Sequence, residues 1–263
     1  MLLYRVLSAL VGIPVILFAV WYGGLPLSTV ILILTVLGIY EMSRLWERMG
    51  VHVWLPGALT GGTLYVAAAH FGNGNLSMSA MFVALVIGIF YLLTVYPSFN
   101  FIDLAGTFFT SLYTGWLLTH LISLRQLADG FHYVLLVLAA TWGTDTLAYF
   151  IGTRFGKHKM APVISPNKSL EGALGGLAGS LIAAVVIGLL NPHMSFIHYL
   201  VIGLLTGIFG QAGDLVESAF KRLAAVKDSS KVIPGHGGVL DRFDSMYWTA
   251  PIVYYYLVIL VAK

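Results

Sequence analysis

SAFKRLAAVKDSSKVIPGHGGVLDRFD, residues 218–244, is a strongly polar stretch in an otherwise apolar chain. The chain is 59% hydrophobic and 10% charged, yet this stretch joins many charged side chains to a Pro-Gly-His-Gly-Gly turn. Its charged residues are Lys221, Arg222, Lys227, Asp228, Lys231, Asp241, Arg242 and Asp244. Apolar runs of helical length flank it, so the stretch is predicted to be a loop between two helix ends, and the chemistry is expected there.

Both predicted helix ends carry carboxylates. Upstream, the spacing i, i+3, i+4, i+7 places four polar side chains on one helix face: Asp214, Glu217, Ser218 and Lys221. Downstream, Asp241 and Asp244 are spaced i, i+3 and share a face as well. Two acidic helix ends therefore flank one basic, glycine-rich loop.

Composition indicates a membrane protein. The mean hydropathy is +0.89 over 263 residues, and apolar runs repeatedly reach the roughly 20 residues that span a bilayer. The chain has no cysteine, which excludes disulfides, thiolate metal ligands and a cysteine nucleophile. The net charge of +3 is too small to indicate a polyanionic partner, and no nucleic-acid partner is expected.

The predicted fold is all-α and polytopic, with about nine transmembrane helices. The expected segments are 4–22, 26–43, 53–71, 78–97, 105–124, 132–153, 171–190, 197–220 and 245–262. We divide the chain into residues 1–125, with about five spans, and residues 126–263, the expected catalytic region with about four spans. The loops at 154–170 and 221–242 belong to this second region.

The distribution of positive charge predicts the orientation. With the N-terminus in the cytoplasm, all but two of the 14 Lys and Arg residues fall on the cytoplasmic side. The exceptions are Arg125 and Lys263. The positive-inside rule therefore favours a multi-pass protein of the inner (cytoplasmic) membrane with both long loops in the cytoplasm.

Two acidic residues lie within predicted helices. Glu41 precedes Arg44 and Arg48 near a helix end, and we favour an interfacial charge pair, with a role in the site as the alternative. Asp145 lies well inside an apolar helix, where a carboxylate costs at least about 2.5 kcal/mol unless it faces a partner or a wet cavity. We expect it to be buried near the site, on the same cavity as Asp214, and to face either a metal or a basic partner, for which Lys168 and Lys221 are the candidates.

Ser165, Lys168 and Ser169 come directly before a predicted helix, where free backbone N–H groups favour an anion. The glycines of a Walker A loop are missing ahead of Lys168. The following helices carry glycines at small-xxx-small spacing, which allows close approach of helix backbones. These are Gly172, Gly175, Gly176, Gly179, Gly203 and Gly207.

Asp214, Asp241 and Asp244 are the predicted metal ligands. Two carboxylates about 5 Å apart repel by roughly 3 kcal/mol at an effective dielectric of 20, so three can share a site only with protonation or a cation. Oxygen ligands without cysteine suit Mg²⁺ or Mn²⁺, and we expect Mg²⁺, with one or two ions bound.

The basic residues around these acids are the predicted phosphate contacts. They are Lys168, Lys221, Arg222, Lys227 and Arg242. Gly237 and Gly238 are expected to expose backbone donors, and His236 to contact or orient a phosphate. Acids that hold a metal beside bases that hold phosphates are typical of phosphoryl or nucleotidyl transfer. The simpler alternative is a positive-inside loop whose acids only pair with its bases.

The pattern from Ser218 to Asp244 resembles the CDP-diacylglycerol synthase (phosphatidate cytidylyltransferase) family throughout its length. The block from Asp145 to Gly172 resembles the family too, except that Asn167 stands where the family commonly has Lys. The resemblance implies a Mg²⁺-dependent reaction in which CTP and membrane phosphatidate give CDP-diacylglycerol and pyrophosphate. It leaves the oligomeric state open, a homodimer included.

Two other functions are the alternatives to this one. A CTP-dependent lipid kinase, or a cytidylyltransferase for another lipid phosphate, would use similar residues, and its products would distinguish it. A secondary transporter would require inverted repeats and paired broken helices, and the sequence has neither.

Overall fold

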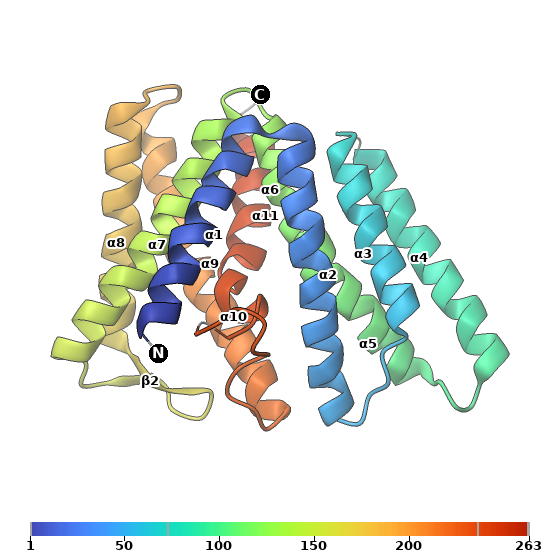
Figure 1. Cartoon of the computed structure of the whole chain (residues 1–263). Helices are drawn as coiled ribbons and strands as arrows, with labels where there is room; N and C mark the ends of the chain where they lie inside the picture. Colours follow the sequence, from blue (N-terminus) through green and yellow to red (C-terminus); the bar gives the residue numbers. More distant parts are fainter. Residues whose placement is uncertain (1, 73, 236, 262–263) are drawn as a thin grey trace. The chain divides into compact units, whose positions relative to one another are not determined.

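The computed structural model describes residues 2–72, 74–235 and 237–261, and for residues 2–7, 9 and 74 it describes the backbone alone. The described chain is almost entirely helical (Figure 1). Five of its helices are long and apolar enough to cross a membrane: Gly24–Arg48, Asn75–Val95, Gly130–Phe155, Leu170–Leu190 and Phe196–Leu223. The chain is therefore an all-α protein of the multi-pass membrane type.

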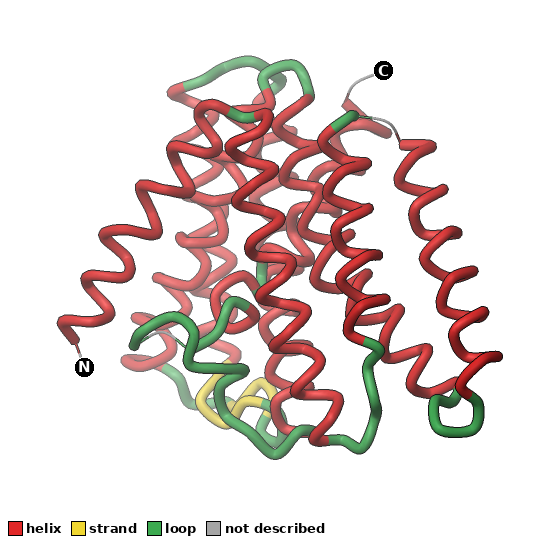
Figure 2. The backbone as a smooth tube through the Cα atoms, turned by 45° about the vertical axis from the view of Figure 1, so that its right-hand side comes forward, coloured by secondary structure: helices red, strands yellow, loops and turns green. Residues whose placement is uncertain are grey.

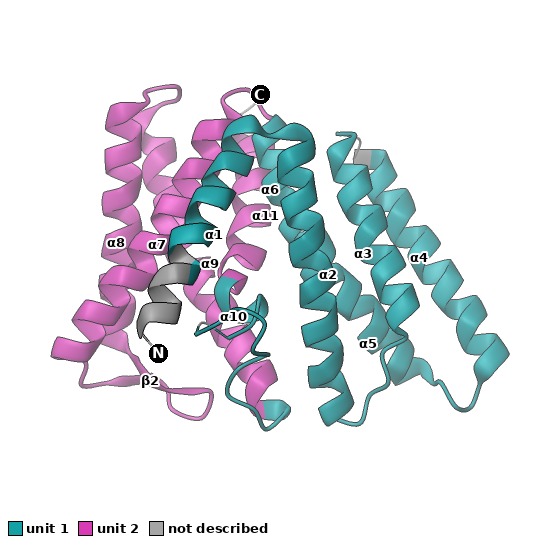
Figure 3. Cartoon of the chain, viewed as in Figure 1, with its two compact units in different colours: residues 1–126, 223–242 teal, residues 127–222, 243–263 magenta. Residues whose placement is uncertain are grey.

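The chain forms two compact units (Figure 3). Unit 1 comprises residues 1–126 and 223–242, and unit 2 comprises residues 127–222 and 243–263. The sequence had suggested one boundary, near residue 125. In the structure, residues 223–242 group with the N-terminal helices.

Unit 1 contains six α-helices and a π-helical turn before the loop at 223–242. They are α1 (Leu2–Tyr22), α2 (Gly24–Arg48), α3 (Leu55–His70), α4 (Gly74–Val95), α5 (Phe101–Ser111), η1 (Leu112–Trp116) and α6 (Leu117–Gln126). The short helix α10 (Leu240–Phe243) crosses the boundary between the units. Unit 2 contains α7 (Gly130–Phe155), β1 (Lys159–Ala161), β2 (Ser165–Ser169), α8 (Leu170–Leu190), α9 (Phe196–Leu223), α11 (Met246–Tyr256) and η2 (Leu257–Val261).

Polar side chains hold the helix ends of unit 1. Arg125 Nε donates to Val20 O at 2.7 Å and Nη2 to Trp21 O at 2.9 Å, which satisfies two carbonyls at the end of α1. Asp103 and Asn100 form a capping box at the start of α5. The same Asp103 carboxylate accepts the backbone N–H of His52 at 2.7 Å, so it also fixes the loop after α2.

Glycines let the helices of unit 2 pack closely, as their spacing predicted. A Cβ atom added to Gly143 of α7 would lie 2.7 Å from the carbonyl oxygen of Gly179 in α8. A Cβ atom on Gly203 of α9 would lie 2.7 Å from the Cβ of Ala184 in α8. Neither position has room for a side chain, so α7, α8 and α9 form a closely packed frame.

The connection from α7 to α8 contains a short antiparallel hairpin of β1 and β2 (Figure 2). Its second strand leads directly into α8, where the Ser169 hydroxyl caps the helix by accepting the N–H of Gly172 at 3.1 Å. Glu171 in the first turn of α8 accepts the backbone N–H of Lys157 at 3.0 Å and contacts His158 Nδ1 at 2.6 Å. These contacts fix Lys168, which lies in the second strand.

Candidate functional site

An acidic cluster lies at the C-terminal half of α9. Asp214, Glu217 and Asp244 each offer a carboxylate oxygen, and these oxygens all lie within 4.8 Å of one another. Asp214 and Glu217 share a face of α9, as their i, i+3 spacing predicted. Glu217 was not among the predicted metal ligands, and its i, i+3 spacing from Asp214 was the signal that could have identified it.

Asp244 reaches this cluster because the turn before α11 is pinned to α9. The Ser245 hydroxyl donates to Gly210 O at 3.0 Å. A Cβ atom on Gly213 would lie 2.6 Å from Asp244 O, so only glycine allows the turn to approach this closely. Gly213, the residue before Asp214, therefore lets the second acidic segment approach the first, and the Gly210 carbonyl anchors it.

Two lysines pair with the cluster. Lys168 Nζ lies 2.5 Å from Asp214 Oδ2, and Lys221 Nζ lies 2.6 Å from Glu217 Oε2. The Glu217 side chain is 1% exposed and that of Lys221 is 12% exposed, so solvent screens this second pair weakly. Both lysines were predicted phosphate contacts, and both lie at the acids.

Negative charge is in excess in this cluster. Burial, reinforced by the neighbouring Asp214 carboxylate, raises the pKa of Asp244 to about 7. When Asp244 is ionised, three carboxylates face two ammonium groups, which leaves one negative charge that a cation would compensate. The donor set consists of carboxylate oxygens only, which fits Mg²⁺ and does not fit a metal that prefers thiolate or imidazole.

Asp145 differs from its prediction. Its side chain is exposed on the surface of α7, not buried. Its charge nevertheless contributes to the raised pKa of Asp244, so it lies near the cluster. Its exposure differs from the expected burial, whereas its position near the cluster agrees with the expectation that it lies close to Asp214.

The other predicted residues are spread over both units. In unit 2, Ser165 begins β2, and Arg222 Nε donates to Ile164 O at 3.1 Å. In unit 1, Lys227 and Arg242 are exposed. His236 lies outside the described residues.

Asp241 organises its own loop in unit 1. Its Oδ2 accepts the N–H of Ser229 at 2.9 Å and the N–H of Gly238 at 2.7 Å, and it lies 2.9 Å from the Ser229 hydroxyl. The backbone donor of Gly238, which we had expected to face a phosphate, is thus used within the protein. Gly237 has a φ of 88°, a conformation that favours glycine.

Glu41 lies in a different environment from the one predicted. It is not an interfacial charge pair: its side chain is 2% exposed and accepts hydrogen bonds from the loop at 229–240. The donors are Ser229, Ser230, Val239 and Leu240. No local pattern could reveal this, because the partners lie 188 to 199 residues later in the chain.

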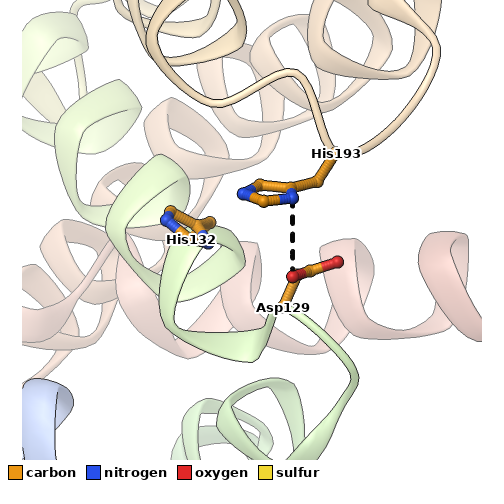
Figure 4. A group of neighbouring side chains, drawn as sticks. All are labelled: Asp129, His132 and His193. Atoms are coloured by element: carbon orange, nitrogen blue, oxygen red, sulfur yellow. Dashed lines mark ion pairs between the residues drawn. The ribbon is translucent and has the colours of Figure 1, made fainter.

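A second group of possible metal ligands, Asp129, His132 and His193, lies elsewhere in unit 2 (Figure 4). His193, from the connection between α8 and α9, places Nδ1 3.6 Å from Asp129 Oδ1. The rings of His132 and His193 lie 4.5 Å apart between centroids. This group was not predicted, because His193 lies about 60 residues after Asp129 and His132 in the sequence.

A model of the cytidylyltransferase family matches residues 3–260. The chain belongs to this family. The family predicted from residues 218–244 and 145–172 is thereby confirmed, and the match extends over the N-terminal helices, where no sharp motif was found.

Relatives in this family cover nearly the whole chain. The phosphatidate cytidylyltransferase of Staphylococcus haemolyticus is 34% identical over 254 residues, covering 95% of this chain and 96% of the relative. The enzyme of the same name from Bacillus subtilis is 34% identical, with 96% of each chain covered. That of Staphylococcus aureus (strain COL) is 35% identical over 254 residues.

Proposed function

We propose that this chain is a phosphatidate cytidylyltransferase that makes CDP-diacylglycerol from CTP and phosphatidate. A phosphate oxygen of phosphatidate attacks the α-phosphorus of CTP, the bond between the α-phosphorus and the bridging oxygen breaks, and pyrophosphate leaves. The cluster of Asp214, Glu217 and Asp244 with Lys168 and Lys221 carries this proposal, because it combines a cation site with two ammonium groups.

The reaction requires little proton transfer. The second pKa of a phosphate monoester is about 6, so phosphatidate is already largely ionised near neutral pH. The main task is to bring two anionic groups together in line and to compensate charge on the leaving pyrophosphate.

We assign Mg²⁺ to Asp214, Glu217 and Asp244, where it would compensate charge on the CTP phosphates. Lys168 and Lys221 would exchange their carboxylate partners for phosphate oxygens once the cation has taken over those carboxylates. Asp241, which we had predicted as a third ligand, we assign to holding its loop.

The direct test is incubation of purified protein with labelled CTP, phosphatidate and Mg²⁺. CDP-diacylglycerol and pyrophosphate are the expected products, and Asp214→Asn should form neither. Release of CDP with phosphorylation of a lipid alcohol would instead identify a CTP-dependent lipid kinase. If the enzyme prefers a different lipid phosphate to phosphatidate, the proposed substrate is wrong and the proposed cytidylyl transfer still holds.

We further propose nine spans in the cytoplasmic membrane, with the N-terminus and the loops at 154–170 and 221–242 in the cytoplasm. The charge distribution supports this orientation. Because the chain has no cysteine, single cysteines report one position each. Val163→Cys (88% exposed) and Val232→Cys (49% exposed) should resist an impermeant thiol reagent in intact cells, whereas Phe71→Cys (73% exposed) should react. The reverse pattern would invert the topology.

A further inference from the structure

The Glu41 carboxylate in α2 accepts four hydrogen bonds, all from the loop at 229–240. Oε1 accepts the Ser230 hydroxyl at 2.7 Å and the N–H of Val239 at 2.9 Å. Oε2 accepts the Ser229 hydroxyl and the N–H of Leu240, both at 2.9 Å. An ionised carboxylate offers about four acceptor positions. Oε1 thus has one hydroxyl and one backbone donor, and Oε2 has one backbone donor and shares the Ser229 hydroxyl with Asp241, an arrangement that suits an ionised carboxylate.

The contact between the loop and Glu41 also explains why residue 238 is a glycine. A Cβ atom added there would overlap both the Glu41 carboxylate and the Ser229 hydroxyl. The loop therefore meets Glu41 with bare backbone at this point. Glu41 of α2 thus explains the presence of glycine at position 238.

We propose that Glu41 is a positioning residue of the enzyme, which holds the loop at 229–240 in its working conformation. This deepens the proposed function and rests on it. Glu41 acts through the loop: Ser229 links it to Asp241, and the loop ends at Leu240, two residues before Arg242. The N-terminal helices thus have a part in catalysis beyond anchoring the chain.

Glu41→Gln is a discriminating change because it keeps the size of the side chain. Its amide nitrogen cannot accept a hydrogen bond, so one of the N–H groups of Val239 and Leu240 loses its partner. An N–H group that loses its charged acceptor and stays buried without a partner destabilises the loop conformation. The cost corresponds to a roughly 10- to 100-fold change in an equilibrium or rate constant. We expect kcat to fall by this factor while KM for CTP changes less.

The readout of loop position is hydrogen–deuterium exchange. In Glu41→Gln, amides of residues 229–240 should exchange faster, while peptides from α4 and α8 stay as in the wild type. Glu47→Gln is the matched control, since Glu47 is an exposed acid on the same helix and should change neither exchange nor kcat. Unchanged exchange at 229–240 in Glu41→Gln would overturn the proposal.

A double-mutant cycle provides a second, milder test. Ser230→Ala removes one donor, and its effect on kcat should be less than additive with that of Glu41→Gln. Full additivity would show that the two residues act separately, against the proposal. If wild-type protein makes no CDP-diacylglycerol, the proposed function fails, and the exchange experiment still decides whether Glu41 holds the loop.

The group of Asp129, His132 and His193 supports a second, independent proposal. We infer that Asp129, His132 and His193 form a binding site for a divalent transition metal such as Zn²⁺. Their ligand atoms all lie within 4.8 Å of one another, and Figure 4 shows the three side chains gathered from the start of α7 and from the connection between α8 and α9. Two imidazoles and one carboxylate are a donor set that suits Zn²⁺ and not Mg²⁺.

His132 gives this inference independent support. Its Nδ1 is buried and has no hydrogen-bond partner within the described part of the chain, and a buried polar atom without a partner is costly. Asp129 has a left-handed backbone conformation with φ 59°, uncommon for a residue other than glycine. A bound metal would join the start of α7 to the α8–α9 connection.

Cobalt binding tests this site, because Co²⁺ replaces Zn²⁺ and absorbs visible light. The protein is purified without a polyhistidine tag, in an Asp214→Asn background so that the acidic cluster on α9 contributes less. One Co²⁺ per chain with visible absorption is expected, lost in His132→Gln and in His193→Gln. The control is His158→Gln, an exposed histidine also paired with a carboxylate. Equal binding in all four proteins, or no binding in any, would overturn the proposal.

Discussion

The hydroxyl of Ser229 lies 2.9 Å from the carboxylate of Glu41, a residue 188 positions earlier in the chain. The same hydroxyl lies 2.9 Å from Asp241 Oδ2. A hydroxyl has one proton, so it can donate to only one of the two carboxylates at a time. Ser229 therefore links the acid of α2 to the acid of the loop.

Asp214→Asn and Asp244→Asn should each lower kcat by at least roughly 100-fold, because each removes a charge that holds the cation. Neither should unfold the protein, since both changes lower repulsion within the cluster. Specific activity and thermal stability are measured on the same preparations, with Glu47→Gln as the control. Near-normal turnover in both variants would contradict the metal assignment.

Lys168→Met should raise KM for CTP by roughly tenfold or more, because a charged contact to phosphate is lost. Lys159→Met is the matched control: Lys159 lies in the same hairpin but is exposed, and no ion pair to it is found among the described residues. Initial rates over a range of CTP concentrations separate KM from kcat. The assignment fails if both variants behave alike.

Gly238→Ala should lower activity and thermal stability together, because the new methyl group would occupy the space of the Glu41 carboxylate. Gly12→Ala is the comparison, since a Cβ atom there meets nothing within 4 Å. It should be neutral or slightly stabilising, as Ala favours a helix over Gly. A Gly238→Ala protein with wild-type kcat would show that the loop can shift without loss.

Gly143→Ala should destabilise the protein by roughly 1–3 kcal/mol, because the added carbon meets a backbone carbonyl of α8 that cannot rotate away. The midpoint of thermal unfolding in detergent measures this. An unchanged midpoint would mean that α7 and α8 can separate slightly at no cost.

The long helices were predictable from apolar runs, and each expected segment has a helical counterpart in the described part of the chain. The largest differences are at the ends. The helix expected at 105–124 starts at Phe101, because Asn100 and Asp103 cap it there. The helix expected at 26–43 continues to Arg48, because charged residues at a membrane surface do not end a helix.

Contacts between distant segments could not be predicted. The hairpin at 159–169 was missed because its strands are only three and five residues long and show no alternation of polar and apolar residues. The role of Glu41 was missed because hydrophobic periodicity describes neighbours in sequence only. Asp214 and Glu217, by contrast, share a helix turn, so their proximity was readable from spacing alone.

Unit 1 is discontinuous, and this has a consequence for how the chain is made. Residues 1–126 leave the ribosome long before the loop at 223–242, with α7, α8 and most of α9 synthesised in between. Until that loop arrives, the Glu41 carboxylate lacks the donors that satisfy it in the finished protein. The N-terminal helices can insert early, but their folding is completed only near the end of synthesis. A fragment that stops at residue 126 would lack this contact, whereas co-expression with residues 127–263 would restore it.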